Sequence, residues 1–286
     1  MASYYKHSGK ISIFGLVGGM FAGVALALAL GPFYALVLVY NPSAHLGILL
    51  PVLLSGALGF GVAFTMKKLG SRNAWVPPLM ALATAGLALF ISWPSWFAVM
   101  LWREGAGQDA LFAFWPPSFL ELLAGVYAEG AWTIGRSGGA VSGLFLGFVW
   151  LCETVIVLGV APFIALAVAG DGIYCEQCQR WCRRVPSELR LDVSQVGQVA
   201  RRLEQGDLNV LTETQRAPDT EDLWAAVVLN HCEGCGETNT LLVENVTRGR
   251  DSRGNQTLHR APIVRFMLIT KDQAAWARRA IYGETP

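Results

Sequence analysis

Two cysteine pairs of identical spacing stand in the last part of the chain, Cys175-Glu-Gln-Cys178 and Cys232-Glu-Gly-Cys235. A C-x-x-C pair can place two thiolates on one side of a tight turn, and two such turns complete the tetrahedral shell that zinc prefers. A shell of four cysteines leaves the metal no open position for water, so such a site is structural rather than catalytic. The spacing therefore predicts a structural zinc ion held by these four residues.

Two neighbouring residues, Cys182 and His231, could each substitute for a ligand, because shells of three cysteines and one histidine are common. The spacing does not distinguish zinc from iron in such a shell, although cysteine spacing typical of an iron–sulfur cluster is absent from the sequence. Thiol-redox chemistry is the enzymatic alternative for a C-x-x-C pair. Two pairs outside a βαβ pattern fit that alternative poorly.

Charged residues are unevenly distributed along the chain. The 286 residues are 53% hydrophobic and only 15% charged, whereas ordinary soluble domains carry roughly 25% charged residues. Most of the charges follow Gly170, which predicts a membrane part over residues 1–170 and a soluble domain over residues 171–286. The net charge of +1 gives no general attraction to nucleic acid, so nucleic-acid binding is not expected.

Four apolar stretches are long enough to cross a bilayer, which requires about 20 helical residues. They cover residues 11–40, 46–66, 76–102 and 139–169. The first stretch continues well beyond a possible signal-peptide cleavage site near Ala29, which favours an uncleaved anchor. The sequence thus predicts an all-α transmembrane part of four helices, followed by a small α+β domain.

The basic residues of the short connections predict the orientation. Lys6 and Lys10 precede the first stretch and Lys67 and Lys68 end the second, whereas few basic residues lie on the other side. By the positive-inside rule, both termini are expected in the cytoplasm, in a bacterial inner (plasma) membrane. That compartment is reducing, which favours metal ligation by the cysteines over disulfides.

Residues 103–138 form the one large segment expected on the outer side. Pro116-Pro117 interrupts any continuous helix there, and Ser118 with Glu121 fits a capping box. We expect a short amphipathic helix at the outer interface, with Trp115 and Trp132 as anchors. A re-entrant hairpin or an additional span is the alternative.

Small residues recur at four-residue spacing in the first and last predicted spans. Such rows allow close approach of membrane helices, either between copies of the chain or within one bundle. The rows consist of Gly15, Gly19 and Gly23, and of Gly139, Gly143 and Gly147.

Glu153 is the only ionisable residue deep inside a predicted span. A charge at that depth is costly, so the carboxyl group is expected to be protonated, partnered by a polar group or exposed to a water-filled cavity. One interpretation is a proton or cation site. The other is a neutral glutamate that is hydrogen-bonded across the bundle.

The soluble part alternates strand and helix patterns around the cysteines. Strands are expected at 188–192, 223–229, 238–246 and 263–270, and helices at 195–205 and 271–282. The two cysteine turns and the strands after the second one resemble zinc ribbons as a broad class. That resemblance implies Cys175, Cys178, Cys232 and Cys235 as ligands, with a helical insertion between the two turns.

The hairpin expected between the last two strands carries a local excess of basic side chains. These side chains could contact lipid head groups or an acidic partner, and a solvated hairpin is the alternative. The residues are Arg248, Arg250, Arg253 and Arg260.

The sequence contains no G-x-S-x-G, Walker or H-E-x-x-H motif, so an enzyme is not expected. The leading hypothesis is an integral membrane subunit whose zinc-stapled cytoplasmic domain docks other protein subunits or supports an oligomer, including a homo-oligomer. A small channel or transporter that uses Glu153 is the first alternative. A membrane-bound thiol-redox or lipid enzyme is the second.

Overall fold

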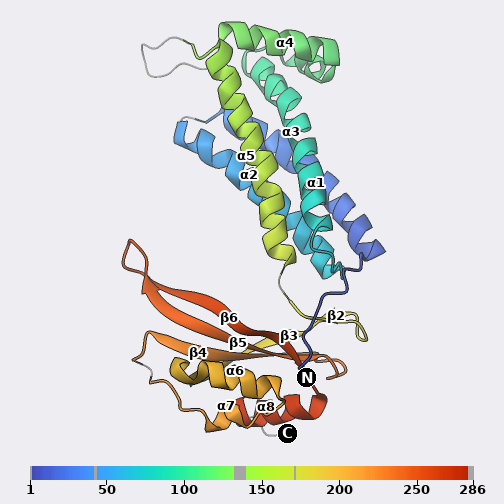
Figure 1. Cartoon of the computed structure of the whole chain (residues 1–286). Helices are drawn as coiled ribbons and strands as arrows, with labels where there is room; N and C mark the ends of the chain where they lie inside the picture. Colours follow the sequence, from blue (N-terminus) through green and yellow to red (C-terminus); the bar gives the residue numbers. More distant parts are fainter. Residues whose placement is uncertain (1, 42–43, 132–139, 171, 219, 283–286) are drawn as a thin grey trace. The chain divides into compact units, whose positions relative to one another are not determined.

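The computed structural model describes the chain except residues 1, 42–43, 132–139, 171, 219 and 283–286 (Figure 1). Contacts divide the chain into two compact units. Gly9–Asp171 form the first, and Met1–Ser8 together with Gly172–Pro286 form the second. Residues 2–8, which the charge distribution assigned to the membrane part, pack with the C-terminal domain in the structure.

The first unit confirms four apolar helices that are each long and apolar enough to span a membrane. Helices of 25 to 28 residues measure about 37–42 Å at 1.5 Å per residue, which exceeds the roughly 30 Å hydrocarbon core. They therefore have length to spare for tilting. The helices are α1 (Ile13–Val39), α2 (Ala44–Lys68), α3 (Val76–Arg103) and α5 (Gly143–Ala169) (Figure 1).

Small residues line many of the helix contacts in the bundle beside buried larger ones such as Leu58, and many large apolar side chains point outward. Helices α1 and α5 each pack against both α2 and α3, so α1 and α5 occupy opposite corners of the bundle. Ala27, Ala85 and Ala161 are fully buried at the helix contacts, whereas Phe90 and Leu144 are 76% and 87% exposed. Close packing through small residues with apolar groups outside is the pattern expected in lipid, where burial of apolar side chains gives no driving force.

The glycine row of α1 is used inside this bundle. A Cβ atom added at Gly19 would lie 2.5 Å from Met66 Cγ, and one at Gly23 would lie even closer to Thr84 Oγ1. The row therefore permits close packing within one chain, and it gives no argument for self-association. In the α5 row, Gly147 faces the ring of Tyr127, and position 139 lies outside the described residues.

The outer segment contains the 3₁₀ helix η1 (Gly107–Phe114) and the helix α4 (Pro116–Glu129), which meet at an angle of 106°. The predicted capping box is wrong, because α4 begins at Pro116 and its first two residues are prolines, so Ser118 already lies inside the helix. Proline suits the first turn since its missing N–H has no partner to lose there. Trp115 is exposed, and the second proposed anchor at position 132 lies outside the described residues.

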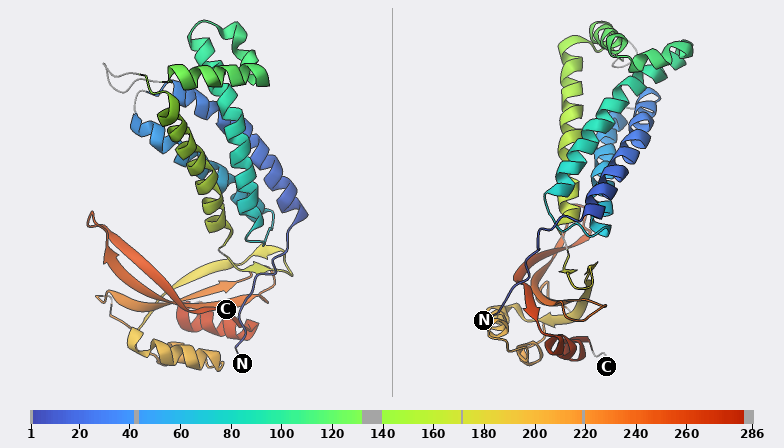
Figure 2. Two further views of the ribbon diagram at one scale, coloured as in Figure 1. Left: turned by 45° about the horizontal axis from the view of Figure 1, so that its top comes forward. Right: turned by 90° about the vertical axis from the view of Figure 1, so that its right-hand side faces the viewer.

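The second unit is a strand-rich domain with one four-stranded antiparallel sheet in the order β3-β4-β5-β6 (Figures 1 and 2). A separate pair of very short strands, β1 and β2, contains the first cysteine pair. Helices α6 and α7 lie between β3 and β4 in sequence, and α8 follows β6. The bounds are β1 (Tyr174–Cys175), β2 (Arg180–Trp181), β3 (Arg183–Leu191), α6 (Val196–Glu204), α7 (Val210–Glu213), β4 (Leu223–His231), β5 (Asn239–Arg250), β6 (Gln256–Ile269) and α8 (Lys271–Tyr282).

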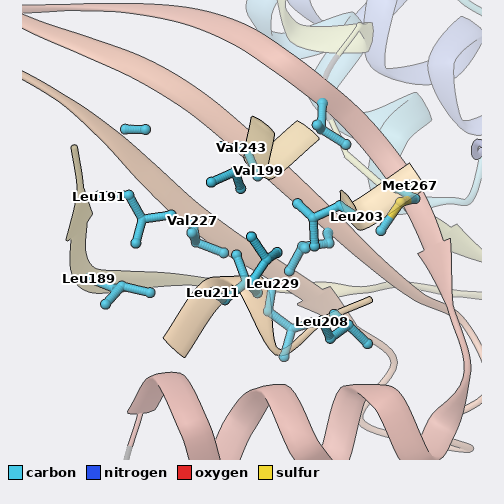
Figure 3. Close-up of a cluster of buried hydrophobic side chains, with 14 of the residues drawn as sticks. Leu189, Leu191, Val199, Leu203, Leu208, Leu211, Val227, Leu229, Val243 and Met267 are labelled. Atoms are coloured by element: carbon cyan, nitrogen blue, oxygen red, sulfur yellow. The ribbon is translucent and has the colours of Figure 1, made fainter. Parts of the chain in front are cut away.

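One face of the sheet packs against the helices and forms the core of the domain (Figure 3). Residues two apart on a strand share a face, so Val227 and Leu229 of β4 point to the same side and meet Val199 and Leu203 of α6. Each of these side chains is at most 1% exposed. The helical insertion thus supplies the apolar layer that this sheet requires.

The segment 2–7 explains why the N-terminus belongs to this domain. Leu268 donates its N–H group to the Ser3 carbonyl oxygen at 2.7 Å, and Tyr5 donates its N–H group to the Phe266 carbonyl oxygen at 2.9 Å. Tyr4 is paired antiparallel with Met267. The segment therefore covers the outer edge of β6, which would otherwise present unpaired backbone groups.

Candidate metal centre

The structure brings the four predicted cysteines together. The sulfur atoms of Cys175, Cys178, Cys232 and Cys235 all lie within 4.8 Å of one another. With Zn–S bonds of about 2.3 Å, the sulfurs of a tetrahedral site are separated by roughly 3.8 Å. The observed group is therefore the right size to hold a metal ion.

The first knuckle consists of residues 174–181 and is a minimal hairpin. Its strands pair only through Tyr174 with Trp181 and Cys175 with Arg180. Gln179 directly follows the second cysteine and adopts a φ of 49°, in the left-handed region that non-glycine residues rarely occupy. This backbone turn brings both sulfurs to one side, at the expense of some strain at Gln179.

The second knuckle consists of residues 231–239 and connects β4 to β5. Gly236 stands at the position equivalent to Gln179 and has a φ of 67°, which glycine adopts without penalty. The Gly236 N–H donates to the Cys232 carbonyl oxygen at 3.0 Å, and the Cys232 N–H donates to the Thr238 carbonyl oxygen at 3.0 Å. The two long strands thus position this turn directly.

Backbone N–H groups favour the thiolate form at the second knuckle. Burial acts to raise the pKa of Cys232, but the N–H groups of Cys235 and Gly234 outweigh burial and lower that pKa to about 6. The Glu237 N–H, 3.4 Å from the Cys235 sulfur, lowers the pKa of Cys235. A hydrogen bond with Cys235 raises the pKa of Cys178 to about 12. Because the thiolate is the form that binds metals, the second knuckle is prepared for ligation by its own backbone.

The two pairs meet as one group. The Cys175 and Cys235 sulfurs, which belong to different pairs, are 3.5 Å apart. A redox C-x-x-C motif requires contact only within a pair, whereas a metal shell requires contact across pairs. The geometry therefore favours metal binding over thiol exchange.

Neither of the possible substitute ligands joins this group among the residues that the structure describes. The Cys182 sulfur is 3.7 Å from the Thr238 carbonyl oxygen, and burial raises the pKa of Cys182 to about 12, which keeps the thiol neutral. His231 is the last residue of β4 and is buried beside the second knuckle. The four-cysteine set needs neither of them.

In the membrane unit, Glu153 has a partner that no sequence pattern predicted. The Tyr34 hydroxyl of α1 donates to Glu153 Oε1 of α5 at 2.5 Å. The bond crosses the bundle between its two opposite corners, and Tyr34 is only 4% exposed. A tyrosine within an apolar span gives no sequence signal for such pairing. This arrangement matches the hydrogen-bonded interpretation of Glu153.

The four predicted arginines do not form one cluster. Arg248 lies over the ring of Trp224, and Arg260 donates to Glu244. Arg253 belongs to the turn between β5 and β6, where its N–H donates to Asp251 Oδ1. Arg184 and Arg190 of β3 join Arg248 and Arg260 on the same sheet face, and no sequence pattern near the hairpin predicted them.

Comparisons of the chain with models of protein families, with curated proteins and with solved structures each gave no match. The structure by itself defines a chain with four apolar helices and a small strand-rich domain whose cysteine cluster could bind a metal.

Proposed function

We propose that the protein is an integral membrane subunit whose C-terminal domain is a zinc-stapled, ribbon-like module that docks another protein or supports oligomeric assembly. The approach of the four cysteine sulfurs within 4.8 Å carries this proposal. A closed shell of four thiolates suits a structural metal, and zinc fits it because zinc accepts tetrahedral sulfur ligation without redox chemistry. The metal then joins β1 and β2 to the sheet, to which the first knuckle is otherwise weakly connected.

The short connection to the membrane supports a docking role. Helix α5 ends at Ala169 and β1 begins at Tyr174, so only residues 170–173 separate the last membrane helix from the first knuckle. A domain on such a short tether stays close to the bilayer. That property is useful for holding a partner, and it requires no catalytic group.

The packing of residues 2–7 supports the proposed topology. Because the segment pairs with β6, it must lie on the same side of the membrane as the C-terminal domain. An even number of spans satisfies this requirement and an odd number does not. The η1–α4 pair is thus proposed to be interfacial or re-entrant, and the positive-inside rule then puts both termini in the cytoplasm of a bacterial inner membrane.

Metal content of the full-length protein, purified in detergent, tests the site. We expect about one zinc ion per chain in the wild type. Cys175→Ser and Cys232→Ser are expected to lose the metal, whereas the matched control Cys182→Ser retains it. Iron in place of zinc would change the identity of the assigned metal. Loss of metal from the control would show that Cys182 belongs to the set of ligands. A wild type without metal would overturn the site.

The docking role is tested separately by the mass of the purified particle and by cross-linking in membranes. We expect a stoichiometric partner or several copies of the chain, and we expect Cys175→Ser to lose this assembly while still inserting into the membrane. A zinc-loaded monomer without partners would contradict the docking role and leave the metal site intact.

The channel or transporter alternative rests on Glu153 and is tested in liposomes. If Glu153 conducts or couples protons, Glu153→Gln abolishes proton-coupled flux. If Glu153 is instead a structural hydrogen-bond acceptor for Tyr34, Tyr34→Phe lowers the stability of the bundle by about 1 kcal/mol, the contribution of one buried hydrogen bond. In that case, neither the wild type nor the variant shows flux.

A further inference from the structure

The sheet face opposite the core gathers arginines from three strands. The strand register determines on which face each side chain lies. Leu191 and Ala225 are paired and belong to the core. Because neighbouring residues of a strand point to opposite faces, the adjacent pair, Arg190 and Ala226, lies on the face away from the core. The same alternation applies along the neighbouring strands. The set, called the arginine face, consists of Arg184 and Arg190 of β3, Arg248 and Arg250 of β5, and Arg260 of β6.

Acidic residues neutralise only part of this charge. One carboxylate, that of Glu244, is shared between Arg184 at 3.2 Å and Arg260 at 3.0 Å. Asp222 lies 3.7 Å from Arg248 and is mostly exposed. Within the part of the chain that the structure describes, Arg184, Arg248, Arg250 and Arg260 stand against these two carboxylates, which leaves an excess of positive charge on this face even without Arg190.

Packing holds this charge in place. The guanidinium groups of Arg190 and Arg248 lie over the Trp224 ring, 4.6 and 5.5 Å from its centre. Trp224 itself is 7% exposed, so it acts as a platform rather than as a contact surface. The side chains of Arg184 and Arg260 remain 53% and 44% exposed while they hold Glu244. The face is therefore both ordered and accessible.

Two covalent tethers hold this domain at the membrane. Residues 170–173 connect it to α5, and a chain of that length spans at most about 14 Å. Residues 6–12 connect the β6-paired segment to α1 and span at most about 25 Å. The domain cannot leave the membrane surface, so its arginines meet lipid head groups at high effective concentration.

We propose that the arginine face binds the head-group phosphates of anionic phospholipids in the leaflet to which the domain is tethered. Guanidinium groups form paired hydrogen bonds with phosphate oxygens, and basic residues near an anionic leaflet are attracted to it. The charge is spread along three strands of a sheet, which suits several head groups of a lipid surface better than one small anion. Hollows of about 160 and 200 Å³ in the domain are lined by other residues.

The test measures lipids retained by the full-length protein in detergent, by native mass spectrometry, after titration with phosphatidylglycerol or phosphatidylcholine. The wild type is expected to retain several-fold more phosphatidylglycerol, and Arg248→Gln/Arg250→Gln is expected to lose most of that preference. The control is Arg201→Gln/Arg279→Gln, which removes the same charge from exposed positions on α6 and α8 and is expected to behave as wild type. Arg184→Gln/Arg260→Gln is a second face variant, and thermal unfolding verifies the fold of each.

Three results would overturn the proposal. Equal retention of the two lipids by the wild type would show no anionic preference. An equal loss in the control variant would show that only net charge matters. Displacement of the lipid by millimolar inorganic phosphate would identify a site for the free anion. The outcome is independent of metal content, which is measured on the same samples.

Discussion

The two knuckles share a cysteine spacing but differ in how the chain holds them. The second connects two long paired strands, β4 and β5, whose hydrogen bonds continue to its base. The first is held by a hairpin whose strands pair at only two positions. The comparison teaches that one half of the metal centre is preorganised by the sheet, and that the other half depends on the metal and on outside contacts.

The outside contact comes from the segment 2–7. The Tyr5 hydroxyl accepts a hydrogen bond from the Tyr174 N–H at 3.0 Å and donates to the Tyr174 carbonyl oxygen at 3.3 Å. It thereby pairs with both backbone groups of the residue that precedes Cys175. The ring of His7 lies beside those of Tyr5 and Trp181, which extends the contact to the other strand of the hairpin.

Removal of the metal is expected to give the largest difference between the knuckles. Structural zinc supplies on the order of 10 kcal/mol in small zinc peptides, so its loss removes the main support of the first knuckle. After chelation of the full-length protein, amide hydrogen exchange is expected to rise strongly over residues 173–182 and far less over 232–238. Equal increases in both segments would contradict the comparison.

Gly236→Ala is expected to destabilise the second knuckle, with a smaller effect than removal of the metal. An added Cβ atom meets nothing closer than 3.6 Å, at Lys271 Cε, so the penalty comes from the backbone. A left-handed φ costs an alanine roughly 1–2 kcal/mol. Thermal unfolding of the zinc-loaded protein measures the effect. Gly197→Ala on α6 is the control, because open space surrounds that glycine and its backbone is helical.

Tyr5→Phe is expected to weaken zinc binding with little effect on the sheet. The two hydrogen bonds to Tyr174 are lost, and a loss of about 1 kcal/mol corresponds to roughly fivefold weaker affinity. Competition with a chromophoric chelator measures this change. Tyr4→Phe is the matched control, since its hydroxyl contacts the exposed Glu204 side chain far from the cysteines. If both variants bound zinc as tightly as the wild type, the Tyr5 hydroxyl would have no role in supporting the metal centre.

Gln179→Gly is expected to give the smallest effect, and in the opposite direction. It relieves the left-handed strain at the first knuckle, and the greater freedom of glycine in the unfolded chain offsets part of the gain. The net stabilisation should be less than about 1 kcal/mol. A loss of stability or zinc affinity would show that the Gln179 side chain contributes more than its backbone does.

Local patterns made the apolar helices, parts of the four long strands and the cysteine group predictable, whereas β1, β2 and the first residues of β3 and β6 were not predicted. The apolar stretches and the C-x-x-C spacing are visible within short windows, and the structure places the four sulfurs together as expected. The contacts that were missed join distant residues. Tyr34 and Glu153 are hydrogen-bonded although 119 positions separate them in the sequence, and Tyr5 and Tyr174 are hydrogen-bonded although 169 positions separate them. No periodicity marks them, because each depends on how whole elements pack.

The capping box failed for a related reason. Ser118 and Glu121 have the right spacing, but Pro116 is a better first residue for a helix, so the helix begins earlier than the motif implies. The arginine face was only partly predictable from the sequence. Arg184 and Arg190 join it because β3 pairs with β4, and they lie far from the other arginines along the chain.

The pairing of residues 2–5 with β6 also sets an order of events during synthesis. These residues leave the ribosome before any of the membrane helices, whereas β6 follows all of them. The early segment must therefore wait, unpaired, until the last strand is made. Pairing of this segment with β6 thus marks a chain that has been translated through residue 269, and until then the unpaired segment is open to chaperones or to strands of other chains.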